Sequence, residues 1–267
     1  LTQLRSDESR LAFIGGNPHR PRQVVSMDLD SGEFSELRAA QSVSLDPEHF
    51  SEPENLTLTI HGRQVHTWFY PPRNPDYQAP PGELPPLVVK SHGGPTSHSE
   101  PNLNLEIQFW TSRGFAVADV NYSGSTGYGR EYRERLNGNW GILDVEDCCG
   151  VADELGRMGV VDPERLMIRG GSAGGYTTLC ALTFASTFKA GASYYGVSDL
   201  EVLAGDTHKF ESRYMDTVVG PYPAAKEVYQ QRSAIHHLEG LDCPVIFFQG
   251  EDDPVVLRTR PSGWCRR

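Results

Sequence analysis

Ser172 stands between four glycines in the stretch RGGSAGG, residues 169–175. An apolar, strand-like run precedes this serine and a helix-like run follows it, so the G-x-S-x-G spacing falls at a strand-to-helix turn. Gly170 and Gly174 would let such a tight turn close, and the serine hydroxyl would then lie beside the N–H groups of a helix N-terminus. The pattern predicts a nucleophile that attacks carbonyl carbon. The alternative is a glycine-rich turn in which Ser172 merely caps the helix.

A second glycine pair ends an earlier apolar strand, in the stretch SHGGPTS at residues 91–97. Backbone N–H groups at such a loop stabilise the oxygen anion of a tetrahedral intermediate. We therefore predict an oxyanion hole formed by the N–H groups of Gly94 and Ala173. The alternative for this stretch is an ordinary strand-ending turn before Pro95.

A third strand end carries two carboxylates, in the stretch FFQGEDDPVV. In hydrolases with this type of turn, the acid that orients the catalytic histidine follows the serine in the chain. Asp253 fits the spacing after Gly250 better than Asp252, and it is the predicted acid. A solvated acidic turn is the alternative.

The histidine that should follow this acid does not occur in the printed sequence. His92 is expected to be structural in the oxyanion loop, and His236 and His237 are expected to be loop or surface residues. We therefore assign none of them as the base. All nine histidines precede Asp253: His19, His49, His61, His66, His92, His98, His208, His236 and His237.

Five dense apolar runs alternate with helix-like segments between residues 87 and 250. Runs of this kind are typical of strands buried on both faces, and the alternation predicts an α/β fold with a mostly parallel, doubly wound sheet. Ligands bind such sheets at the carboxyl ends of the strands, where all three stretches described above lie. The five runs are LVVKSHGG, FAVADVNY, RLMIRGG, AGASYYG and PVIFFQG.

The first 50 residues have a different character. They contain short β-like runs and the turn DLDSGE, and such a hairpin is marginal by itself. We expect them to be the tail of a larger β-rich domain or to pack on the rest. A further antiparallel pair and a proline-rich loop come next, at about residues 54–86.

Composition limits the classes of partner and cofactor. The net charge is −11, from 35 acidic and 24 basic residues, and no Lys/Arg-rich run occurs, so we expect no nucleic acid partner. No apolar run approaches the roughly 18 residues of a membrane span, and no signal pattern precedes the first strands, which predicts a cytoplasmic protein without a membrane partner. The five cysteines lack metal or redox spacing, so we expect free thiols, no metal and no cofactor.

Several separate blocks resemble, in the right order, the catalytic domain of the prolyl oligopeptidase family of serine peptidases. They are SHGGPTS, NYSGSTGYGREY, VDPERLMIRGGSAGGYTTL and SYYGVSDLE, and the similarity is closest to acylaminoacyl-peptidase and dipeptidyl-peptidase-like bacterial members. The resemblance covers about residues 55–256 and implies an α/β-hydrolase domain joined to a β-propeller. Residues 1–50 would then be the end of the propeller, and 51–267 a peptidase domain that lacks its histidine-bearing part.

The resemblance also implies roles for individual residues. Ser172 corresponds to the nucleophile, Asp253 to the triad acid, and Gly94 with Ala173 to the oxyanion donors. A weaker alignment places Tyr194, Tyr195 and Leu203 along the substrate pocket. Leu257 stands where the family has proline, and from there the pattern dissolves, so we expect a truncated or frame-shifted reading of the gene.

Three functions remain open from the sequence. The first is a serine peptidase that cleaves short peptides through an acyl-enzyme on Ser172, with activity lost in this chain for want of the histidine. The second is a carboxylesterase or lipase, because the same motifs serve ester hydrolysis. The third is an inactive fragment or pseudoenzyme with an unpaired sheet edge. Assembly into a homo-oligomer is left open.

Overall fold

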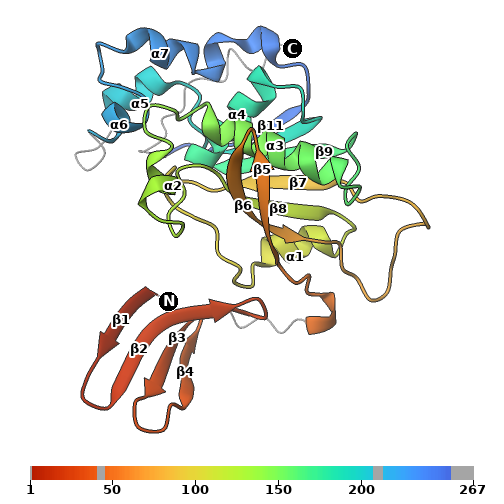
Figure 1. Cartoon of the computed structure of the whole chain (residues 1–267), viewed down its shortest axis with the longest axis vertical. Helices are drawn as coiled ribbons and strands as arrows, with labels where there is room; N and C mark the ends of the chain where they lie inside the picture. The colour runs from red at the N-terminus through yellow and green to blue at the C-terminus, as the bar shows by residue number, and fades with distance from the viewer. Residues whose placement is uncertain (1, 41–45, 207–212, 254–267) are drawn as a thin grey trace.

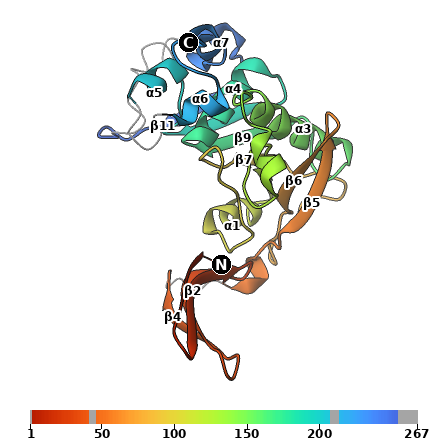
Figure 2. The same ribbon diagram turned by 60° about the vertical axis from the view of Figure 1, so that its left-hand side comes forward.

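The computed structural model describes residues 2–40, 46–206 and 213–253. These residues form two β-sheets, one of four strands near the N-terminus and one of seven strands with helices around it. Figure 1 shows the small sheet set apart at one end, and Figure 2 shows α1 on the side of the larger sheet that faces it. No helix in these ranges has the length and apolar character to cross a membrane.

The small sheet is an antiparallel meander. Its inner strands form the predicted pair of β-like runs, and Asp28 closes the turn between β3 and β4 by accepting a hydrogen bond from the Ser31 N–H at 2.9 Å. Phe13 and Val25 are its buried apolar residues, while β1 and β4 are exposed throughout. The sheet therefore has little core of its own, as its marginal pattern indicates. The strands are β1 (Thr2–Ser6), β2 (Arg10–Asn17), β3 (Arg20–Asp28) and β4 (Phe34–Ala39).

The seven-stranded sheet has the order β11-β10-β9-β7-β8-β6-β5. The five strands β7 to β11 run parallel, and β5 and β6 add an antiparallel pair beside β8. This confirms the α/β class and all five predicted core strands. The strands are β5 (Glu54–Ile60), β6 (Arg63–Tyr70), β7 (Leu87–Ser91), β8 (Ala116–Asn121), β9 (Leu166–Gly171), β10 (Ala190–Tyr194) and β11 (Val245–Phe248).

Helices α1, α3 and α4 are among the helix-like segments that alternate with the core strands. The Asn104 side chain caps α1 by accepting from the Glu106 N–H at 2.9 Å, which explains where that helix begins. The α-helices are α1 (Leu105–Thr111), α2 (Arg130–Glu134), α3 (Leu143–Arg157), α4 (Ala173–Phe184), α5 (Leu200–Asp206), α6 (Tyr214–Val218) and α7 (Lys226–Gln231), with 3₁₀ turns η1 (Pro47–His49), η2 (Ala234–His236) and η3 (Leu238–Gly240).

Two apolar clusters cover the two faces of the large sheet. Val88 and Val117 pack with Ile107 of α1 on one face. Their neighbours Leu87 and Val89 pack into the larger cluster with α3 and α4 on the other. Because side chains alternate along a strand, one apolar run supplies both clusters.

Strand β11 differs from expectation. The run PVIFFQG predicts a strand buried on both faces, yet Ile246 is 53% exposed and Phe248 is 44% exposed. In the described residues β11 is the edge strand, paired only with β10. An apolar run predicts that a strand can be buried. Actual burial also requires neighbouring elements that cover the strand.

The cysteines in the described residues are all free thiols, as predicted, and three of the four are buried. Cys148 and Cys149 lie in α3 within the larger apolar cluster, where they pack as small apolar side chains. Cys265 lies outside the described residues.

Candidate active site

Ser172 lies at the junction of β9 and α4 with φ 55° and ψ −121°. A non-glycine residue with positive φ is strained, and such strain collects at functional sites. Its backbone N–H donates to the Tyr194 carbonyl at 3.0 Å, which fixes the turn. The side chain makes no capping hydrogen bond to α4. Ser172 thus occupies the N-cap position of α4 without capping the helix through its side chain, and its role as nucleophile stays a prediction.

The glycines on either side have no room for a side chain. A Cβ on Gly170 would lie 2.3 Å from the Gly174 carbonyl oxygen, and a Cβ on Gly174 would lie 2.1 Å from the Ser91 carbonyl oxygen. The Ser91 hydroxyl donates to the Gly174 carbonyl at 2.8 Å. The first turn of α4 is thus pressed against the end of β7, which confirms the steric reason for the glycines.

The predicted oxyanion loop follows β7 and reaches the serine. A Cβ on Gly93 would lie 3.7 Å from the Ser172 Cβ. Gly94 has φ 129°, a conformation that favours glycine. Ala173 is the first residue of α4, so its N–H has no acceptor within the helix. The two donors come from adjoining segments, and their role in catalysis stays a prediction.

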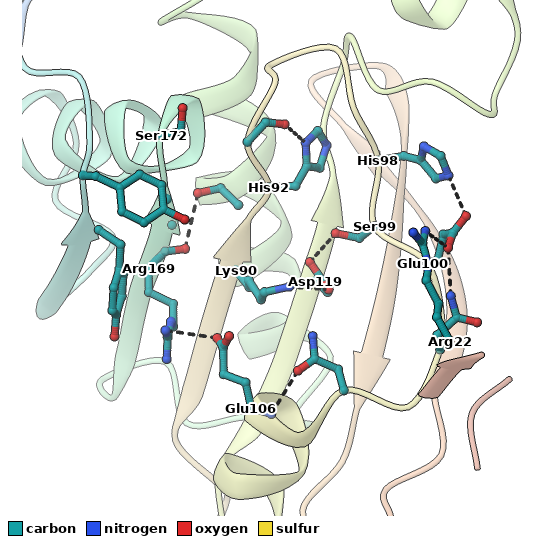
Figure 3. A pocket seen from close by; sticks show the side chains of 18 of the residues that line it. Arg22, Lys90, His92, His98, Ser99, Glu100, Glu106, Asp119, Arg169 and Ser172 are labelled. Atoms are coloured by element: carbon teal, nitrogen blue, oxygen red, sulfur yellow. Dashed lines mark hydrogen bonds and ion pairs between the residues drawn. The ribbon is translucent and has the colours of Figure 1, made fainter. Parts of the chain in front are cut away.

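A cavity of about 620 Å³ opens beside Ser172. Tyr194 and Tyr195 line it, and their role in binding substrate stays a prediction. Leu203 is not among its lining residues and packs instead against the core from α5. Figure 3 shows charged side chains from several elements facing the same space, and sequence reasoning did not single these out: Arg22, Lys90, Glu100, Glu106, Asp119 and Arg169.

Lys90 and Asp119 did leave a signal in the sequence, since each is a charged residue within an apolar strand. Their Nζ and Oδ2 atoms lie 3.1 Å apart, and Asp119 is 2% exposed. Burial disfavours the charged form of Lys90, but the neighbouring carboxylate outweighs it and raises the pKa of this lysine. The pair joins β7 to β8 beneath the oxyanion loop.

The other cavity carboxylates are paired as well. Glu106 lies 3.1 Å from Arg169, whose guanidinium also stacks over the Tyr194 ring at 4.5 Å. Glu100 pairs with Arg22 of the small sheet. Since three carboxylates face three basic side chains, the cavity lining has little net charge to select an ionic substrate.

Asp253 follows β11 and accepts a hydrogen bond from the Gln249 amide at 3.2 Å. It is half-buried, whereas Asp252 is exposed. A carboxylate that orients an imidazole is expected to be the more buried one, because its charge then acts through less water. This geometry favours Asp253 over Asp252, and its catalytic role stays a prediction.

Two histidines line the cavity, and both rings are engaged elsewhere. The two nitrogens of His92 lie 2.8 Å from the Gly93 carbonyl and 2.8 Å from the Ser125 hydroxyl. Those of His98 lie 2.9 Å from the Thr126 hydroxyl and 3.2 Å from a Glu100 oxygen. Neither ring has a nitrogen left for Ser172, which agrees with a structural role for His92.

His236 and His237 lie away from this cavity, as expected. His236 is exposed in η2, with its Nε2 atom 3.7 Å from Asp199. The ring of His237 packs against Phe184 with centroids 5.2 Å apart. His208 lies outside the described residues. No group of three or more metal-ligating side chains occurs in the parts of the chain that the structure describes.

The environment of His92 predicts a pH effect on stability. Loss of hydration lowers the pKa of this ring from 6.5 to about 4. As the pH falls from 6.5 toward 4, the unfolded chain takes up a proton that the folded chain does not, so folding loses at most about 3 kcal/mol. We expect urea unfolding midpoints to fall less steeply with pH in His92→Asn than in the unmodified chain. His19→Asn, at an exposed position, serves as the control; equal slopes in all three would contradict the prediction.

A mostly parallel sheet with a glycine-flanked serine at the strand-to-helix turn after β9 defines an α/β-hydrolase. The sequence pattern of the prolyl oligopeptidase family matches residues 101–267. The chain belongs to this family.

Among relatives, the uncharacterized peptidase YuxL of Bacillus subtilis is 28% identical over 262 residues, which is 94% of this chain and 38% of that protein. A puromycin-hydrolyzing peptidase of Mycobacterium tuberculosis superimposes with a TM-score of 0.96 at 46% identity, covering 98% of this chain and 40% of that one. A puromycin hydrolase superimposes with a TM-score of 0.92 at 41% identity, covering 99% and 40%. The chain thus spans about two fifths of each of these proteins.

Proposed function

We propose that the chain carries the hydrolytic centre of a serine peptidase, with Ser172 as the nucleophile. The observation that supports this most is the placement of Ser172, strained and uncapped, against the glycine loop that follows β7. Membership of a peptidase family favours amide substrates over the simple esters of a carboxylesterase or lipase.

In this proposal the Ser172 oxygen bonds to the substrate carbonyl carbon, and its proton passes to a base. The negative oxygen of the intermediate accepts hydrogen bonds from the N–H groups of Gly94 and Ala173. The C–N bond then breaks, the proton moves to the leaving amine, and water later releases the acyl group from the serine. Asp253 would hold the base in orientation.

The proposed substrates are short peptides and amides of single amino acids. The relatives whose printed names mention puromycin suggest an aminoacyl amide, and the rings of Tyr194 and Tyr195 offer apolar walls for its side chain. Arg22 brings the small sheet to the rim of the cavity. We propose that this sheet is the end of a propeller that limits substrate size. Free thiols throughout the described residues suit the reducing cytoplasm.

We further propose that turnover by these 267 residues is slow for want of a base. Both cavity histidines are engaged with other partners, and no histidine follows His237 in the printed sequence. Loss of a triad member typically costs several orders of magnitude in rate. In this proposal Ser172 is correctly placed for catalysis, but its hydroxyl lacks a base to accept the proton.

Added imidazole is expected to restore part of the activity. A small base can enter a cavity of about 620 Å³ beside Ser172 and accept its proton. We expect hydrolysis of an aminoacyl 4-nitroanilide to rise at least about tenfold with imidazole at neutral pH, after subtraction of the rate with Ser172→Ala. A Ser172-dependent rate that is present without imidazole and that imidazole leaves unchanged would show that the chain has its own base. Cleavage of p-nitrophenyl esters alone would favour the esterase.

A further inference from the structure

Figure 3 shows the ring of His92 beside the oxyanion loop. Three contacts hold this ring. Its Nδ1 lies 2.8 Å from the Gly93 carbonyl oxygen, and its Nε2 lies 2.8 Å from the Ser125 hydroxyl. The ring stacks on Tyr122 with centroids 4.2 Å apart, and the Tyr122 hydroxyl donates to the His92 carbonyl at 2.9 Å. The stretch that supplies Tyr122 and Ser125 follows β8 directly, so two neighbouring strand ends are joined here.

The hydrogen bonds determine where the ring carries its proton. A carbonyl oxygen can only accept, so Nδ1 must donate to Gly93. In a neutral ring Nε2 is then bare and accepts the Ser125 proton. The Tyr122 carbonyl, 2.7 Å from the Ser125 hydroxyl, also accepts the Ser125 backbone N–H at 3.0 Å, so it keeps a donor when the hydroxyl turns to the ring.

The carbonyl that His92 holds belongs to the same peptide unit as the proposed oxyanion donor. The C=O of Gly93 and the N–H of Gly94 share one rigid plane, so fixing the carbonyl also fixes the direction of the N–H. Two adjoining glycines make rotation of this peptide easy, and Gly94 has φ 129°. A hydrogen bond accepted by the carbonyl also polarises the unit and strengthens its N–H as a donor.

We propose that His92 is a positioning residue for the oxyanion hole: its Nδ1–H holds the Gly93 carbonyl and thereby aims the Gly94 N–H at the substrate oxygen, while the hydrogen bond from Ser125 to Nε2 holds the ring in place. This rests on the proposed function of Gly94. His92 touches no reacting atom in this scheme, and it acts only through the peptide unit between the two glycines.

Two variants of similar size separate positioning from packing. Asparagine at position 92 keeps an N–H donor near the place of Nδ1, whereas leucine keeps the volume and loses the donor. In Ser172-dependent ester hydrolysis we expect His92→Leu to lower kcat about 10- to 100-fold with KM within about twofold, and His92→Asn to stay within about threefold of the unmodified chain. Equal losses in both variants, or a loss confined to KM, would overturn the proposal. Thermal unfolding checks that both variants fold.

The tautomer is measured separately, without any activity. Long-range proton–nitrogen NMR correlations at pH 7 should show His92 neutral, with its proton on Nδ1, and Ser125→Ala should keep the proton there because the Gly93 carbonyl can only accept. A ring protonated on Nε2 alone, or on both nitrogens, would overturn the proposal whatever the kinetics. If no Ser172-dependent hydrolysis is found in any variant while the Nδ1 proton is present, the proposed function of the serine fails rather than the hydrogen-bond arrangement, and the catalytic role of His92 is rejected with it.

Discussion

With imidazole added as the base, Ser172→Ala is expected to abolish covalent labelling of the chain by a fluorophosphonate probe. The probe phosphonylates a serine whose hydroxyl is accessible, can pass its proton to a base and adjoins donors for the phosphoryl oxygen, and Ser172 lies beside the Gly93–Gly94 loop at the start of α4. We expect at least about a 10³-fold fall in labelling rate, followed by gel fluorescence and by mass mapping of the labelled peptide.

The matched control is Ser31→Ala, at an exposed turn of the small sheet. It should label at the rate of the unmodified chain, and heat-denatured chain should not label at all. Labelling that persists in Ser172→Ala would remove the nucleophile assignment and with it the proposed peptidase chemistry. Absence of labelling in the unmodified chain, both with and without imidazole, would favour the inactive fragment.

Gly174→Ala is expected to have the largest effect on folding. The added Cβ would lie 2.1 Å from the Ser91 carbonyl oxygen and 2.8 Å from the His92 carbonyl oxygen, and both are backbone atoms of the central sheet region. Relief of this clash requires α4 to move away from β7, although α4 is buried along almost its whole length. We expect a loss of about 3 kcal/mol or more in the free energy of unfolding, measured in urea, together with loss of probe labelling.

Gly205→Ala is the matched control for this substitution. Gly205 lies in the helix α5, and a Cβ there would meet nothing within 4 Å. Alanine in a helix is favoured over glycine by roughly 1 kcal/mol, so this variant should be as stable as the unmodified chain or slightly more so. If Gly174→Ala were equally stable, the close packing of α4 on β7 that positions Ser172 would be wrong.

The central part of the fold could be predicted because its signals are local. Each parallel strand is a short apolar run, and β-branched residues and flanking glycines mark its length. The turn at Ser172 could be predicted for the same reason, since the two residues that must lack side chains, Gly170 and Gly174, lie within two positions of the serine. Steric constraints between residues that are close in the chain can therefore be predicted from the sequence alone.

The cavity could be predicted only in part. Arg22 and Glu100 line it with Ser172 although they are separated by some 70 to 150 positions along the chain. Their pairing depends on how the small sheet lies against the loop after β7. No local sequence pattern predicts this placement. Leu203 shows the converse, because the resemblance predicts it in the pocket whereas in the structure it is partly buried against the core from α5.

The sequence by itself determined the family, the five parallel strands and the corner that holds Ser172, because all of these follow from the order and size of neighbouring side chains. Only the tertiary structure decided which charges share the cavity, that both cavity histidines are engaged away from the serine, and that β11 is the edge strand among the described residues. These depend on contacts between distant segments. The type of a residue limits which contacts it can make. Which of these contacts it does make depends on its neighbours in space, and therefore on the packing of the whole fold.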